Sequence, residues 1–121
     1  MAKKTNPFTG RWRITSMSDW KDYYLDEEVE AFIEFDEERC GSFHFGYVRG
    51  LIDHYRTKIR DGTPAIQFTW YGDSADGTPL EGIGWAVLKG DKLRGMLSVY
   101  LGDDSEFVAK QITEKKATKR K

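Results

Sequence analysis

Two histidines, His44 and His54, are the side chains whose placement in the sequence comes closest to a chemical site. Residues 48–50 (VRG) resemble a three-residue hairpin loop, whose glycine would take the left-handed conformation that such loops need. This loop pairs Tyr47 with Leu51 and therefore predicts that His44 lies directly opposite His54. Two imidazoles so placed can share a metal ion, but zinc needs further protein ligands, and no cysteine or third histidine is near. We therefore predict no metal site and expect both histidines on a solvated outer face.

Asp53 is the carboxylate that the pattern places inside the protein. It shares one face of the run 51–59 with Leu51, Tyr55 and Ile59. A carboxylate that faces inward must be paired, hydrogen-bonded or located at the mouth of a cavity. Two interpretations stay open: a structural hydrogen bond, or a polar handle for a ligand together with Tyr55.

Catalytic motifs are absent from the sequence. It contains no glycine-rich phosphate loop, no paired cysteines and no HExxH. Ser105 lies in a GDDS segment with no histidine nearby, and turn chemistry explains that segment more simply. The acidic clusters lack the spacing of a calcium loop. We predict no catalytic residue and no cofactor, and an enzyme is the third and least supported class of function.

The elements that would position these side chains are short runs of alternating apolar and polar residues, a pattern typical of strands. The runs cover residues 10–17, 31–35, 42–48, 51–59, 65–71, 82–88, 93–101 and 106–112. Polar turns connect them, including the Asp-Gly pair at 61–62. The pattern predicts an all-β protein, an antiparallel meander of about eight strands closed or nearly closed into a barrel, because closure removes exposed edges. Residues 18–30 break the pattern and are expected to hold a helical turn or to cap one end.

Length and charge favour one domain of 121 residues. We expect a barrel over 8–113, a disordered segment 1–7 and a disordered basic tail 114–121. Lys3 and Lys4 contribute +2 and the tail contributes +4 to a net charge of −1, which leaves −7 for the body between them. A body this acidic argues against nucleic acid on the barrel. The single Cys40 and the lack of a long apolar run predict a cytoplasmic protein with no membrane segment.

Two resemblances rest on particular motifs. The segment TGRW at residues 9–12 resembles the GxW start of calycins, the group that includes lipocalins, avidins and fatty-acid-binding proteins. This resemblance implies a calycin-like barrel that binds a small apolar or amphipathic ligand in its mouth. The segments GRWRITSMSDW, FHFGYVRGLID, FTWYG, GWAVL and GDDSEFVA together resemble a family of small bacterial β-barrel proteins. That second resemblance implies no activity.

Two functions stay open. A binding barrel would take a small apolar ligand in a cavity, because such pockets are mostly apolar with few polar groups. Its predicted lining residues are Trp12, Phe43, Phe45, Tyr47, Asp53, Tyr55, Trp70 and Trp85. The alternative is a protein-interaction module whose interior is filled by its own side chains. In that case Trp20, Tyr23 and Tyr24 would be exposed interface anchors for a protein partner or a second copy of the chain.

Overall fold

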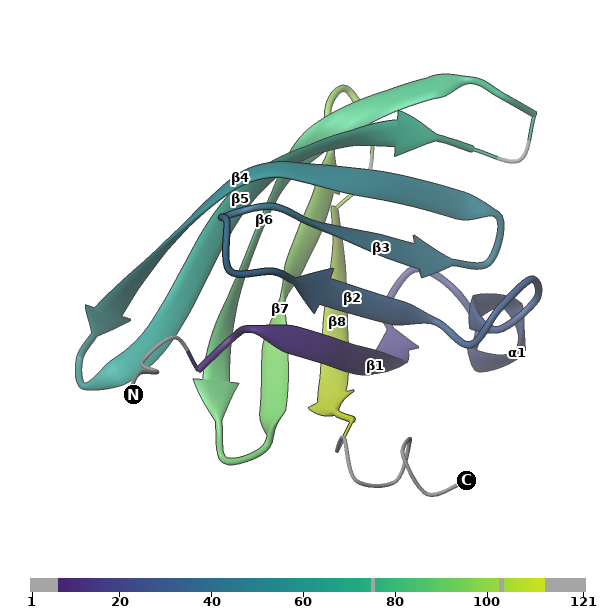
Figure 1. The fold of residues 1–121 in the computed structure, drawn as a ribbon. Coiled ribbons are helices and arrows are strands. Elements are labelled where there is room, and N and C mark those ends of the chain that lie inside the picture. Colours follow the sequence, from purple (N-terminus) through teal and green to yellow (C-terminus); the bar gives the residue numbers. More distant parts are fainter. Residues whose placement is uncertain (1–6, 75, 103, 113–121) are drawn as a thin grey trace, which may run out of the picture.

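The computed structural model describes residues 7–74, 76–102 and 104–112 of the chain. Within this part, eight strands and one short helix follow one another (Figure 1). Their bounds are β1 (Gly10–Met17), α1 (Asp22–Leu25), β2 (Phe32–Phe35), β3 (Gly41–Phe45), β4 (Val48–Arg60), β5 (Thr63–Asp73), β6 (Pro79–Lys89), β7 (Lys92–Val99) and β8 (Asp104–Gln111). The segments 1–7 and 114–121, for which we predicted disorder, lie outside the described residues except for Pro7.

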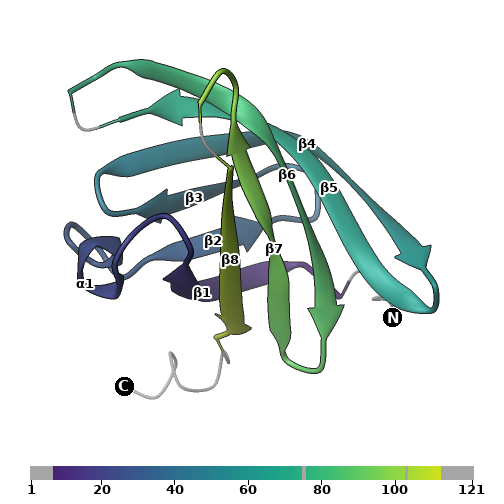
Figure 2. The same cartoon turned by 180° about the vertical axis from the view of Figure 1, so that it is seen from behind.

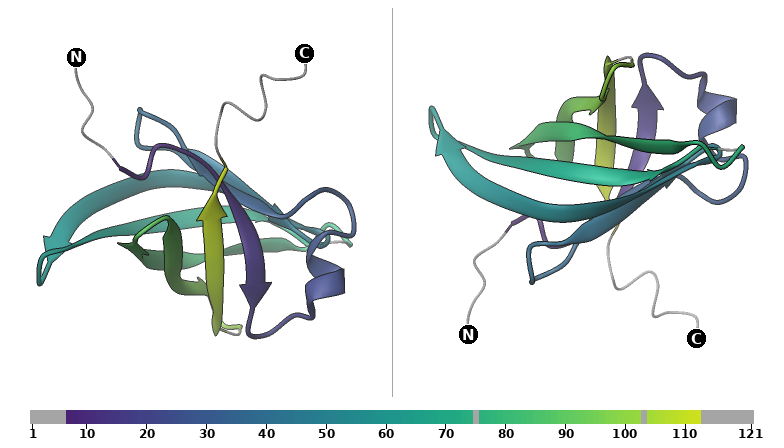
Figure 3. Two further views of the ribbon diagram at one scale, coloured as in Figure 1. Left: turned by 90° about the horizontal axis from the view of Figure 1, so that it is seen from below. Right: turned by 90° about the horizontal axis from the view of Figure 1, so that it is seen from above.

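The sheet is a closed antiparallel barrel. Each strand pairs with the next one along the chain, and β8 pairs with β1 to complete the closure. The strands β1–β3 cross β7 and β8 steeply, and the long, bent strands β4–β6 connect these two walls (Figures 1 and 2). The helix α1 lies at one end of the barrel and the β4–β5 hairpin at the opposite end (Figure 3). The predicted all-β meander of eight strands is therefore confirmed.

Alternation along the strands places the predicted apolar faces of β1, β2 and β5 inside. Trp12 of β1, Phe35 of β2 and Phe68 and Trp70 of β5 are all buried. Two of these rings contact each other: Phe35 lies 5.8 Å from Phe68 between ring centroids, in an edge-on arrangement. Each such ring removes a large apolar area from water, so the core is stabilised mainly by aromatic packing.

The β3–β4 hairpin differs from the predicted one. The chain turns at Gly46 and Tyr47, so that Phe45 pairs with Val48 and His44 pairs with Arg49. Gly46 has φ of +56°, the left-handed conformation that a tight hairpin turn requires. The predicted loop at 48–50 is thus wrong, because the glycine that makes the turn lies four residues earlier.

Strand β4 contains a bulge that the sequence pattern did not reveal. Ile52 pairs with Trp70 and His54 pairs with Thr69, which leaves Asp53 as an extra residue between them. An extra residue reverses the alternation. The inward side chains of β4 are therefore at even-numbered positions up to Ile52 and at odd-numbered positions from Tyr55 onward. Asp53 is consequently exposed, and its predicted inward position is wrong.

The segment between β1 and β2 caps one end of the barrel. Leu25 of α1 is buried, and its carbonyl accepts a 2.7 Å hydrogen bond from the Gly46 N–H. Arg13 of β1 forms ion pairs with Asp26 and Glu30, which hold the following loop against the barrel. Both expectations for residues 18–30, a helical turn and a cap, are met.

Candidate functional site

Five of the eight predicted ligand-contacting residues share the barrel interior. Trp12, Phe43, Phe45, Tyr55 and Trp70 are all buried. Phe43 lies 5.0 Å from Trp70 and 5.9 Å from Phe45 between ring centroids. Phe43 therefore contacts two of the other predicted rings, Phe45 and Trp70.

The polar atoms of these interior residues bind backbone groups. The Trp12 indole N–H donates to the Phe8 carbonyl at 2.9 Å, and the Trp70 indole N–H donates to the Ser98 carbonyl at 3.2 Å. The Tyr55 hydroxyl donates to the backbone carbonyl of Asp36 in the β2–β3 turn. Each of these donors thus has a structural acceptor.

Two rings lie directly against glycines of the neighbouring strand. A Cβ atom at Gly50 would lie 2.3 Å from the Phe43 ring, and one at Gly84 would lie 2.4 Å from the Phe68 ring. A carbon–carbon contact is normally about 3.5–4.0 Å, so no side chain fits between ring and backbone at either place. The rings occupy space that larger inward residues on β4 and β6 would otherwise take.

The other three predicted pocket residues face outward. Tyr47 is 38% exposed in the β3–β4 turn, and Trp85 is 42% exposed on β6. Asp53 is exposed at the β4 bulge. Trp85 faces out because Gly84 and Ala86 take the inward positions of β6, so the prediction that large residues of this run line the interior is wrong.

The predicted interface aromatics near α1 are mostly part of the barrel. Trp20 packs 4.8 Å from Phe45 between ring centroids, and the Tyr24 hydroxyl accepts a 3.2 Å hydrogen bond from the Tyr47 N–H. Both side chains are partly buried against the core. Only Tyr23 of the three, at 77% exposure, has the predicted exposure.

The polar groups at this end pair with one another. The Tyr47 hydroxyl donates to Glu27 at 3.2 Å, and this hydrogen bond together with the Glu27 charge raises the pKa of Tyr47. His44 lies 2.9 Å from the Glu28 carboxylate, whereas His54 pairs with Thr69 across the sheet. The predicted opposition of the two histidines is therefore wrong. Among the described residues, no group of three or more potential ligands could hold a metal ion.

Ser105 joins β8 to β1 at the seam of the barrel. Its buried hydroxyl accepts a 3.2 Å hydrogen bond from the Asp19 N–H and donates to the Glu106 carbonyl at 3.1 Å. Ser18 completes the connection, because its hydroxyl accepts a 2.9 Å hydrogen bond from the Glu106 N–H. The GDDS segment thus supplies a structural serine.

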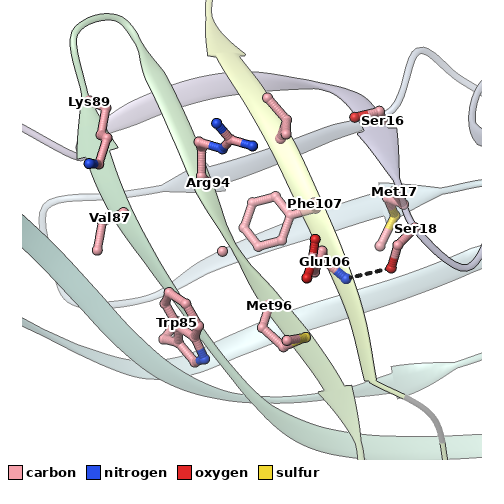
Figure 4. A pocket seen from close by; sticks show the side chains of 12 residues that line it. Ser16, Met17, Ser18, Trp85, Val87, Lys89, Arg94, Met96, Glu106 and Phe107 are labelled. Carbon is pink, nitrogen blue, oxygen red and sulfur yellow. Dashed lines mark hydrogen bonds between the residues drawn. The ribbon is translucent and has the colours of Figure 1, made fainter.

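The outward residues of β4–β8 form a surface that we call the outer face. A hollow of about 620 Å³ lies on it, lined by Trp85 and Val87 of β6, Arg94 and Met96 of β7, and Glu106 of β8 (Figure 4). The register explains this grouping, since Trp85 pairs with Met96 and Met96 pairs with Glu106. Trp85 is therefore a large, exposed side chain at the edge of this hollow.

Two further hollows continue the outer face towards β4. One of about 380 Å³ lies between His54 and Arg56 of β4 and Trp85. The next, of about 320 Å³, is bounded by Ile83 and Tyr100. Ile83 is 57% exposed, so the centre of the outer face is an exposed apolar pair, Ile83 and Trp85. Sequence reasoning missed this centre, although the glycines that alternate with these two residues were the available signal.

Comparisons with known proteins give no family assignment. No helix in the described part of the chain is long and apolar enough to cross a membrane. A scan against family models finds no match, and neither the curated proteins nor the solved structures contain a matching relative.

Proposed function

We propose that this protein is an interaction module whose outer face binds a protein partner. The supporting observation is the arrangement of β6, which directs Gly84 and Ala86 into the barrel and Ile83 and Trp85 to the solvent. An exposed tryptophan at the centre of an apolar patch is typical of the anchors that contribute most of the free energy of protein association.

The interior supports this function over a ligand-binding barrel. Phe43 contacts the rings of Phe45 and Trp70, and Phe43 and Phe68 lie against the backbone of Gly50 and Gly84 without intervening space. A ligand would have to displace rings from a packed core, which costs the contacts those rings now make. Binding of a small apolar ligand in the mouth therefore stays a prediction of the sequence, and the outer face is the better candidate.

Charge indicates the chemistry of the partner. The outer face has carboxylates at the end near the β5–β6 and β7–β8 loops, including Asp53 and Glu81. It has basic side chains at the other end, including Lys89 and Arg94. A complementary partner has an apolar centre between a basic flank and an acidic flank.

Photo-cross-linking from position 85 tests the function. Benzoylphenylalanine replaces Trp85 in one variant and Ile59 in a control variant, because Ile59 is an exposed apolar residue that lines none of the hollows of the outer face. We expect a discrete protein adduct from position 85 alone. The captured protein is then identified, purified and titrated, and Trp85→Ser should weaken its binding by at least about 30-fold, as for a hot-spot tryptophan. Equal labelling from both positions, or binding unaffected by Trp85→Ser, would contradict the proposal.

A further inference from the structure

We infer, on the basis of the proposed function, that the partner of the outer face is a second copy of this chain, related by a two-fold axis near Trp85. The inference starts from the order of side chains along the face. The strand register arranges the outward side chains in rows that run across β4–β8. These rows follow one another along the strands, from one end of the face to the other. The middle row, for example, contains Arg56, Gln67, Trp85, Met96 and Glu106.

The two ends of the face differ in the sign of most of their charges, whereas the middle row carries one charge of each sign, Arg56 and Glu106. Towards the β5–β6 and β7–β8 loops the face carries Asp53, Glu81 and Asp104. Towards the β4–β5 and β6–β7 hairpins the basic side chains outnumber the carboxylates. The carboxylates there are Asp61 and Asp91 in the two turns. The basic side chains are all exposed: Lys58, Arg60, Lys89, Lys92, Arg94 and Lys110. Within the described residues, none of these charged groups has an ion-pair partner, since the ion pairs there involve Arg11, Arg13, His44 and Arg49.

A two-fold rotation makes this separation self-complementary. If a second copy faces the first with its strands reversed, the acidic end of each outer face meets the basic end of the other, and the apolar centres meet each other. A face of uniform charge would repel its own copy, whereas this one attracts it in one orientation. A polyanion such as a nucleic acid would match only the basic end and would be repelled by Asp53 and Glu81.

The shape of the centre fits the same arrangement. Trp85 lies beside the hollow of about 620 Å³ that it lines together with Val87, Met96 and Arg94 (Figure 4). In an isologous interface, a side chain and the recess beside it are each used twice, once on each copy. Each Trp85 can therefore enter the hollow of the opposite copy.

Sedimentation equilibrium of the purified full chain tests the inference, from about 1 µM to about 1 mM, which spans moderate to weak affinities. We expect a monomer–dimer equilibrium that weakens with added salt. Trp85→Ser should raise the dissociation constant by at least about 30-fold, and the control Ile59→Ser should leave it unchanged.

Charge reversal gives the decisive comparison. Lys58→Glu, Lys89→Glu, Arg94→Glu and Lys110→Glu together leave only Arg60 and Lys92 as cations at the basic end, so the face becomes acidic at both ends. Glu81→Lys with Asp104→Lys leaves only Asp53 as a carboxylate at the acidic end, so the face becomes basic at both ends. Each charge-reversed variant alone should be monomeric, and an equimolar mixture of the two should form a heterodimer, because the acidic ends of one variant then meet the basic ends of the other.

Three outcomes would overturn the inference. A chain that stays monomeric up to about 1 mM excludes self-association in the range of weak affinities; a discrete cross-link from position 85 to another protein would then keep the proposed function and reject only the second copy. A dimer that is insensitive to Trp85→Ser and to charge reversal uses another surface. Binding of a labelled single-stranded oligonucleotide by the monomer, lost in Trp85→Ser, would assign the face to a polyanion.

Discussion

Substitution of Gly84 by alanine measures how completely the barrel interior is filled. The added Cβ would lie 2.4 Å, 2.6 Å and 3.1 Å from three carbons of the Phe68 ring. The ring would have to move by about 1 Å to restore an ordinary contact. It meets Phe35 on another side, 5.8 Å away between centroids, so it has little room to move.

The expected change in the free energy of unfolding follows from two opposed effects. Overpacking of a core by one carbon costs about 1–3 kcal/mol, and the replacement of glycine by alanine in a strand returns about 0.5–1 kcal/mol. The two ranges together bound the loss between about 0 and 2.5 kcal/mol, so we expect Gly84→Ala to lower the free energy of unfolding by about 1 kcal/mol, measured by urea denaturation. The adjacent Ile83→Thr, at an exposed position that retains a β-branched side chain, should change it by less than about 0.5 kcal/mol.

A double-mutant cycle with Phe68→Leu completes the test. A smaller side chain at position 68 makes room for the alanine, so the double variant should be more stable than the sum of the single changes by at least about 0.5 kcal/mol. A neutral or stabilising Gly84→Ala, together with additive free energies in the cycle, would refute the filled interior and favour a ligand cavity.

Three further predictions concern the seam, one turn and the interior. Ser105→Ala removes the acceptor of the Asp19 N–H and should lower the free energy of unfolding by about 1–3 kcal/mol, whereas Thr15→Ala, at an exposed hydroxyl, should cost less than half as much; equal losses would contradict the role of the seam. Hydrogen bonds from the Thr78 side chain, from Ser74 and from the Thr78 N–H lower the pKa of Asp76 from 3.8 to about 2. Because the folded pKa is the lower one, Asp76 stabilises the protein fully above pH 3.8. This contribution should disappear as the pH falls towards 2, as an NMR titration of the carboxyl and the pH dependence of Asp76→Asn can show. Any fluorescence that a hydrophobic probe gains from the native barrel should come from the outer face, and should therefore be lost in Trp85→Ser and unchanged in Phe43→Ala. Saturable binding that Phe43→Ala alters and Trp85→Ser leaves intact would instead support a ligand in the mouth.

The strands were predictable where large apolar residues alternate with polar ones. Trp12 and Ile14 of β1 and Ile66, Phe68 and Trp70 of β5 face inward as the pattern indicated. Alternation with a period of two defines two faces and does not say which face is inside. That choice was made from side-chain size, which is correct as long as the inward residues are the large ones.

β6 breaks this assumption for a physical reason. Phe68 and Trp70 of β5 pair with Gly84 and Gly82 of β6. A Cβ at Gly84 would lie 2.4 Å from the Phe68 ring, and one at Gly82 would lie 3.0 Å from the Trp70 indole nitrogen, so these inward positions of β6 must be small. Ile83 and Trp85 then have only the solvent side. The rings that pack against the glycines of β6 belong to β5, and the sequence of one strand taken alone does not reveal a contact with another strand.

The β3–β4 hairpin and the Asp53 bulge were unpredictable for related reasons. Gly46 and Gly50 are both able to make a tight turn, and the packing of Tyr24 over Gly46 decides between them. The bulge depends on how β4 pairs with β5, because Asp53 is skipped in the pairing while its neighbours Ile52 and His54 pair with consecutive residues of β5. Both features are set by contacts with residues that are distant in the sequence.

Fluorine NMR of the protein labelled with 5-fluorotryptophan tests most directly whether the interior is filled and Trp85 is the binding anchor. The chain has four tryptophans, so single Trp→Phe variants can assign the four signals. In dilute solution a soluble paramagnetic reagent should broaden the Trp85 signal strongly and the signals of Trp12 and Trp70 little. On concentration, the Trp85 signal alone should shift and become protected as the second copy covers it. A Trp85 signal that is protected in dilute solution, or that stays unchanged at every concentration and with every candidate partner, would contradict the account.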